Sequence, residues 1–326
     1  MEKKKFRLNL HIIFLISIVL FVIILIFALK NWGVFVDQNE LFKDGEGTYV
    51  DNYDYLTPLK DSDYNVIPLK TSDGLNIMLL GNGPFAEDRN SGNGLANMIA
   101  ETANATVYNC SISGSYVAWE LPYLSSENPM DAFSPYWLSI MTTEIAHDDY
   151  YGNAVKVLGD NAPAEADEVR QTLESIDYDK LDAVVIMYDA TDYFMGHPIY
   201  DTEDYAPVQQ YIANLEATLD TLQENHPNVR IIVMSPTYAF SDQLDENGEY
   251  ISSDIYTYGG EPLSRYAISA QQACAGKGVT YIDNIYGTFN EDQAKDYLTD
   301  NLHLNTEGRR KVAERLVSAL LYFGTN

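Results

Sequence analysis

The sequence predicts a three-layer α/β/α domain, in which helices cover both faces of a five-stranded parallel sheet. Short apolar runs, apolar on both of their faces, alternate with segments of helical periodicity, as in a chain of βαβ units. Glycine-rich or polar loops follow these runs directly, which is typical of buried strands that end at one edge of a sheet. The length of 326 residues suffices for one large domain with a short additional segment.

The apolar runs and the periodic segments alternate along most of the chain. The expected strands are residues 75–80, 105–112, 182–188, 229–234 and 279–282. The expected helices are a segment capped by Ser91 that ends near 103, then 135–147, 164–176, 207–225, 262–275 and 306–323. After the fourth strand comes a polar, tyrosine-rich excursion in which Asn247-Gly248 predicts a hairpin turn.

The N-terminal segment predicts a membrane anchor. Residues 8–29 are almost wholly apolar, long enough to cross a bilayer core as a helix. Three lysines and Arg7 precede this stretch, so the positive-inside rule leaves residues 1–7 in the cytoplasm and the rest of the chain outside. A cleaved signal peptide is the alternative, but the sequence around Ala28 offers no convincing small-x-small cleavage site.

The expected organisation is therefore a cytoplasmic tail (1–7), a single-pass signal anchor in the cytoplasmic membrane (8–29), a lead-in (30–74) and an extracellular domain (75–326). The formal charge is −28, and residues 31–326 alone carry −32. So acidic a surface repels nucleic acid and anionic lipid headgroups, which argues against both as partners of the domain. Cys110 and Cys274 could pair outside the membrane, but they lie in apolar or helical surroundings, and we expect two buried free thiols.

Four loops at the predicted strand ends and before the last helix carry residues suited to chemistry. In an open parallel sheet, a ligand site lies beyond the carboxyl ends of the strands. Taken singly, each of these motifs is weak, because glycines after strands usually form turns and an Asp-x-x-His pair is usually a helix cap. The four loops are Gly81-Asn82-Gly83-Pro84, Ser113-Gly114-Ser115, Asp189-Ala190-Thr191-Asp192 and Asp300-Asn301-Leu302-His303.

In order and spacing, the four loops resemble the conserved blocks of the SGNH (GDSL-type) hydrolases, whose fold is flavodoxin-like. That family has Gly-Asp-Ser after the first strand, glycine after the second, Gly-x-Asn-Asp after the third and Asp-x-x-His before the C-terminal helix. Asp300 and His303 match the last block, and Gly114 matches the second. The resemblance spans residues 75–323 and implies an esterase or acyltransferase.

Two blocks depart from the family pattern. Gly83 stands where the family has its nucleophilic serine, and the third block reads Asp-Ala-Thr-Asp in place of Gly-x-Asn-Asp. The resemblance implies that His303 is the base, that Asp300 orients it, and that Gly83, Gly114 and Thr191 supply oxyanion donors. Removal of a catalytic serine leaves only the rate enhancement that binding and the oxyanion hole provide.

Three hypotheses follow. The nucleophile is displaced to Ser113, Ser115 or Ser91; or His303 activates water directly; or the chain is a pseudoenzyme whose pocket binds carbohydrate or an assembly partner. For an active enzyme we expect O-acyl groups of envelope or environmental glycans, or a small ester, as substrate, from family analogy and location alone. No phosphate-binding signature is present, so we expect no nucleotide, and we expect neither cofactor nor metal ion.

The remaining candidates favour structural roles. His147, His197 and His226 lack partners at metal-ligand spacing. Residues 245–254 resemble an EF-hand calcium loop only weakly and are better explained as a solvated hairpin. The tyrosines of the excursion suit a sugar-stacking wall as well as a lid packed on the core.

Overall fold

The computed structural model describes residues 54–61, 63–70, 74–143, 149–200, 203–322 and 324–325. The predicted anchor at 8–29 and the cytoplasmic tail lie outside these residues. Within the described part of the chain, no helix is both long and apolar enough to span a bilayer.

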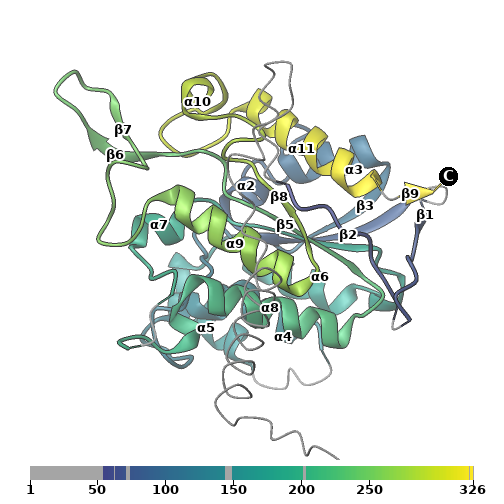
Figure 1. The fold of residues 1–326 in the computed structure, drawn as a ribbon. Coiled ribbons are helices and arrows are strands. Elements are labelled where there is room, and N and C mark those ends of the chain that lie inside the picture. Colours follow the sequence, from purple (N-terminus) through teal and green to yellow (C-terminus); the bar gives the residue numbers. More distant parts are fainter. Residues whose placement is uncertain are drawn as a thin grey trace, which may run out of the picture. The chain divides into compact units, whose positions relative to one another are not determined.

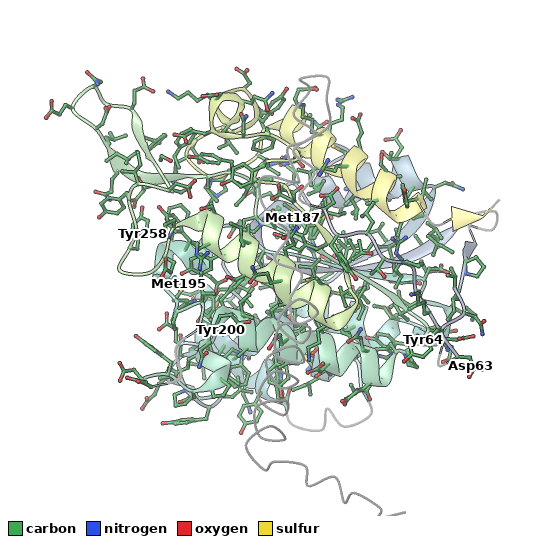
Figure 2. All side chains as sticks on the ribbon, viewed as in Figure 1. Asp63, Tyr64, Met187, Met195, Tyr200 and Tyr258 are labelled. Carbon is green, nitrogen blue, oxygen red and sulfur yellow. The ribbon has the colours of Figure 1, made fainter. Side chains whose placement is uncertain are left out.

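The central sheet has five parallel strands in the order β3-β2-β4-β5-β8, which confirms the predicted sheet. Its strands are β2 (Leu75–Gly81), β3 (Ala105–Asn109), β4 (Ala183–Met187), β5 (Arg230–Met234) and β8 (Thr280–Ile282). The three inner strands β2, β4 and β5 are nearly or wholly buried along their length, as expected for a sheet covered on both faces. Figure 2 shows Met187 among the side chains at the centre, whereas Tyr64 lies at the periphery.

Helices cover both faces of this sheet and complete the three predicted layers (Figure 1). On one face α3 (Leu95–Ala103) packs against α11 (Thr306–Leu321). The other face carries α4 (Pro135–Met141), α8 (Tyr211–Asn225) and α9 (Leu263–Lys277), together with α5 (Tyr150–Leu158) and α6 (Ala166–Ser175). Short helices α2 (Gly83–Ala86), α7 (Thr191–Met195) and α10 (Glu291–Tyr297) lie in loops.

Two predicted helix starts are wrong. The helix expected from Ser91 begins at Leu95 with Gly94 as its N-cap, because the Ser91 hydroxyl accepts from Asn93 N–H and closes a local turn instead. The helix expected from Pro207 splits into a 3₁₀ turn (Pro207–Gln209) and α8, since Gln210 is extended. The sequence also missed α5 and α10.

The chain before β2 lies against the edge of the sheet. Tyr55 and Tyr281 exchange backbone hydrogen bonds of 2.9 and 2.8 Å, so the lead-in covers the outer strand β8. Arg315 of α11 pairs with Asp54 at 2.7 Å. Farther along the lead-in, β1 (Leu69–Lys70) pairs in parallel with β9 (Gly324–Thr325).

The excursion after β5 forms the predicted hairpin. Strands β6 (Phe240–Leu244) and β7 (Tyr250–Ser252) are antiparallel, and the hairpin projects away from the sheet (Figure 1). Its turn residue Gly248 has φ of +82°, a conformation in which glycine is favoured. Both cysteines are buried free thiols, as expected, and burial raises the pKa of Cys110 to about 12.

Candidate active site

The carboxyl ends of the inner strands are held close together. A Cβ on Gly81, the last residue of β2, would lie 2.1 Å from the carbonyl oxygen of Met187, so only glycine allows this approach of β2 to β4. Beyond β3, the backbone N–H of Ile112 still bonds to the carbonyl of Gly81 at 2.9 Å. The loops after the three strands therefore start from one small region.

The fully buried side chain of Asn82 ties these loops to one another. Its Nδ2 donates to the Ser115 carbonyl at 2.8 Å and to Asp189 Oδ1 at 2.7 Å, and its Oδ1 accepts from Asp189 N–H at 2.9 Å. One amide thus connects the first, second and third predicted blocks. Buried polar groups with satisfied hydrogen bonds fix such a junction in one geometry.

The predicted pair of His303 and Asp300 is present in the loop before α11. Asp300 Oδ2 lies 2.7 Å from His303 Nδ1, and Asp300 Oδ1 accepts from the N–H groups of Leu302 and His303, both at 2.8 Å. The carboxylate therefore fixes the orientation of the imidazole. The His303 side chain is 49 % exposed, so Nε2 is accessible to a bound molecule.

Glu87, which the sequence did not single out, lies on the other side of the imidazole. Its Oε1 is 3.5 Å from His303 Nε2, and its Oε2 accepts from Arg309 Nη2 at 3.0 Å. Arg309 comes from the first turn of α11 and is 8 % exposed, and it also pairs with Asp88. Glu87 thus connects the loop after β2 to the last helix.

This arrangement favours the charged form of the imidazole. Burial alone disfavours the charge, but the bond from Asp300 and the nearby charge of Glu87 outweigh burial and raise the pKa of His303 above its ordinary value. Burial raises the pKa of Glu87. The pKa of Asp300 is lowered: burial opposes that shift, and the hydrogen bonds from the His303 N–H, the Leu302 N–H and the His303 ring outweigh it.

The space beside Gly83 is occupied by a carboxylate. A Cβ built on Gly83 would lie 2.8 Å from Asp189 Oδ2 and 3.4 Å from Glu87 Oε1. Asp189 Oδ1 accepts from Asn82 Nδ2, from Thr191 N–H at 2.9 Å and from the Thr191 hydroxyl at 2.5 Å. Asp189 Oδ2 has no hydrogen-bond donor among the described residues.

The three predicted oxyanion donors differ in their surroundings. No described residue accepts from the Gly83 N–H, which remains available to a ligand. Gly114 is exposed and has φ of +72°, which suits a glycine at the tip of the second loop. The Thr191 hydroxyl donates to Asp189, so its proton is directed at the carboxylate.

None of the three alternative serines hydrogen-bonds to His303 within the described part of the chain. Ser115 is fully buried and donates to the carbonyl of Ile112 at 2.8 Å. Ser113 is exposed, and its backbone N–H donates to Glu165 at 2.6 Å. The hydroxyl of Ser91 caps the turn before α3.

The other histidines of the described chain have structural surroundings, as their sequence contexts predict. His226 stacks on Tyr178 with ring centroids 4.9 Å apart and bonds to Thr142. His197 is buried between Asp192 and Glu120. His147 lies outside the described residues.

The hairpin excursion mixes buried and exposed rings. Tyr238 and Phe240 are buried on the core, whereas Tyr250 and Tyr256 are exposed. Asp245 closes the hairpin turn by accepting from Asn247 and Glu249 N–H groups, which supports the interpretation as a solvated hairpin. No group of three or more acidic, histidine or cysteine side chains in the described residues is arranged to hold a metal ion.

A model of the GDSL-like lipase/acylhydrolase family matches residues 80–311, which include all four loops. The chain belongs to this family. It is a divergent member that has Gly83 in the usual serine position. Membership in a family of ester hydrolases supports hydrolase-like chemistry on esters. No curated protein matches the sequence significantly.

Solved structures resemble this chain at low sequence identity. One covers 78 % of this chain and 100 % of its own, with 15 % identity and a TM-score of 0.53. A protein from Lactobacillus plantarum covers 78 % and 97 %, with 19 % identity and a TM-score of 0.49. A carbohydrate acetylesterase from Sinorhizobium meliloti covers 76 % and 99 %, with 10 % identity and a TM-score of 0.45. At 15 % identity, the first of these likenesses concerns the fold alone.

Proposed function

We propose that this protein is an ester hydrolase or acyltransferase in which His303, oriented by Asp300, transfers the protons of the reaction. One observation carries the proposal: Nδ1 of the imidazole is bonded to Asp300 at 2.7 Å, and Nε2 faces Glu87, which also lies beside Gly83. The proton-transfer group therefore adjoins the strand-end loops, where ligands of open parallel sheets bind.

The proposed substrate is an O-acyl group on a glycan of the cell envelope or the environment. The apolar stretch at 8–29, with basic residues before it, supports an anchor in the cytoplasmic membrane and an extracellular domain. The glycan part of the proposal rests on this location, and the family supplies the ester chemistry by analogy. The exposed position of His303 suits a polymeric substrate.

The second candidate function is binding without catalysis. It is favoured by one observation, the absence of a side chain on Gly83 at the family's nucleophile position. The loops around His303 then recognise carbohydrate or an assembly partner, and His303 contributes hydrogen bonds only.

Purified full-length protein assayed on short-chain aryl esters and on acetylated oligosaccharides tests the proposal. We expect turnover that falls about 10²-fold or more in His303→Ala, the usual contribution of a positioned acid or base. Thermal unfolding of both proteins checks that the variant is folded. Equal rates for the two proteins would reject the hydrolase, and glycan binding that survives the substitution would then support the second function.

A further inference from the structure

We propose that Asp189 replaces the missing serine as a catalytic group: its Oδ2 holds and deprotonates the water that attacks the ester, and His303 protonates the leaving alcohol. The inference rests on the proposed hydrolase function and assigns its nucleophile. It differs from the displaced-serine hypothesis and from a mechanism in which the imidazole itself deprotonates water.

The position of Asp189 Oδ2 is the first support. It lies 2.8 Å from the point where a Cβ on Gly83 would stand, so the carboxylate occupies the space of the side chain that Gly83 lacks. Three donors, two of them from Thr191, hold the other oxygen, Oδ1. Oδ2 is therefore aimed in a fixed direction while its own acceptor capacity is unused among the described residues. A base fixed in this way needs no reorganisation when the substrate arrives.

The pattern of departures from the family blocks is the second support. The block after β2 has lost a side chain at Gly83, and the block after β4 has gained one at Asp189, where the family has glycine. The two changes meet in one place, because a serine Cβ at 83 and the Asp189 carboxylate would approach to 2.8 Å. Non-bonded contacts that short are strongly repulsive, and the bonds of Oδ1 prevent an easy rotation of the carboxylate. Serine at 83 would therefore require the Asp189 carboxylate to move from its observed position.

The charges around the site support the division of roles. His303 lies between the carboxylates of Asp300 and Glu87, which favour the imidazolium, the form in which Nε2 carries a proton to donate. Burial raises the pKa of Asp189 from its ordinary value, which makes this carboxylate a stronger base. The two groups interact electrostatically, which is consistent with their acting on one substrate.

The reaction balances without a further reactant. The water oxygen bonds to the ester carbonyl carbon while one water proton passes to Asp189 Oδ2, and the carbonyl electrons form an oxyanion. The Gly83 N–H is available to that oxyanion. When the oxyanion collapses, the C–O bond to the alcohol breaks and His303 Nε2–H protonates the leaving oxygen. The product acid loses its proton to solvent, Asp189 releases its proton, and His303 regains one from water.

Asp189→Asn is the main test, made on the full-length protein with the same esters. Asparagine keeps an oxygen for the Asn82 and Thr191 donors but replaces Oδ2 with an amide that cannot accept a proton. We expect a loss of about 10²-fold or more in kcat with little change in KM or in the unfolding temperature. Glu168→Gln, which removes a surface carboxylate paired with Arg89, is the matched control and should retain wild-type turnover.

Exchange of the two side chains tests the geometry separately. We expect Gly83→Ser alone to resist labelling by a fluorophosphonate probe, because Asp189 occupies the space of the serine. The double variant Gly83→Ser/Asp189→Gly should be labelled at residue 83 at alkaline pH, where His303 is neutral. Labelling of the single variant to the same extent would show that the carboxylate does not fill this space, and would overturn the inference.

A single turnover in ¹⁸O-water tests for covalent attack by Asp189. Direct attack by water places ¹⁸O in the product acid and none in the protein. A mixed anhydride with Asp189 that water opens at the Asp189 carbonyl would place ¹⁸O in the protein, and label found there would overturn the water step. Turnover that survives Asp189→Asn within about threefold would overturn the inference and leave the hydrolase standing, since about threefold is far below the contribution of a general base. Absence of wild-type turnover above His303→Ala would instead reject the hydrolase itself, and the inference with it.

Discussion

Two imidazoles in this protein are each placed between two carboxylates, yet one is closed off from solvent and the other is open to it. The His197 side chain is 7 % exposed, and the His303 side chain is 49 % exposed. Nδ1 lies 2.8 Å from Asp192 in the first case and 2.7 Å from Asp300 in the second. The distances from the ring nitrogens to the nearest carboxylates therefore do not distinguish the two histidines.

The surroundings of the carboxylates make the difference. Both oxygens of Asp192 are occupied by backbone donors, Val117 and Ala118 N–H at 2.9 Å each, and Asp192 itself is buried. The hydroxyl of Tyr266 donates to the His197 carbonyl and closes the turn. Both ring nitrogens of His197 and both oxygens of Asp192 have partners within the protein, so this cluster stabilises the loops that follow β3 and β4.

The cluster around His303 leaves bonding capacity unused. Glu87 Oε1 is 3.5 Å from Nε2, longer than a hydrogen bond, and Asp189 Oδ2 has no donor among the described residues. Water or a substrate can complete these interactions. The comparison teaches that polar atoms with unused hydrogen-bonding capacity distinguish the two clusters, whereas the presence of a histidine–carboxylate pair does not.

The largest expected effect is a contrast between two variants: His197→Ala should lower stability, whereas His303→Ala should lower turnover. His197→Ala removes one partner of a buried ion pair, so we expect a loss of about 3–5 kcal/mol of unfolding free energy. His303→Ala should change the unfolding free energy by only about 0.5 kcal/mol, as at other accessible sites, while it removes turnover. Denaturant unfolding and ester hydrolysis of both variants measure the two effects. Loss of turnover in a fully folded His197→Ala protein would contradict the structural role.

The sequence alone was sufficient to predict the five-stranded sheet and the contact between Asp300 and His303. Apolar runs separated by helical segments predict five parallel strands, because burial on both faces requires such runs. Asp300 and His303 are three residues apart in one loop, so their contact is a local property of the chain. The helix starts at Ser91 and Pro207 were mispredicted because local turns at these residues compete with the helix.

The remainder of the site depends on contacts between distant residues. Nothing in the sequence shows that Asp189 points into the space beside Gly83, since the two residues are on loops after different strands. Glu87 follows Gly83 by four residues, a spacing that could have drawn attention to it. Its contact with His303 still depends on the packing of α11, where Arg309 holds its other oxygen. Block spacing identifies the family, whereas the positions of Asp189 and Glu87 beside Gly83 come only from the tertiary structure.

A second, smaller effect is a shift in the pH dependence of activity when Glu87, the other carboxylate beside His303, is replaced. If His303 acts as the acid, activity falls as pH rises through the pKa of the imidazolium. Glu87→Gln removes a charge that raises this pKa, so the alkaline limb of the kcat/KM profile should move to lower pH. Rates measured across the pH range, with Glu168→Gln as control, check the direction. An acidic limb that moves instead would show that His303 acts as a base.

The smallest effect is the pH dependence of stability, which should be larger for the buried imidazole. Burial disfavours the charge of His197, but Asp192 and Glu120 outweigh burial and raise its pKa in the folded state. The folded protein then binds the proton more tightly than the unfolded chain, so this stabilisation is fully present below about pH 6.5 and is lost as pH rises through the folded pKa.

The unfolding free energy of wild type minus that of His197→Gln should therefore decrease with pH, by up to roughly 1.4 kcal/mol per pH unit between the two pKa values. His303 also has a raised pKa, so the same difference for His303→Gln should have the same sign. Its slope should be smaller, because solvent screens a half-exposed pair. Chemical denaturation from about pH 5.5 to about pH 8.5, on either side of the ordinary histidine pKa, measures both slopes. A steeper slope for His303→Gln would mean that the exposed cluster, and not the buried one, couples protonation to folding.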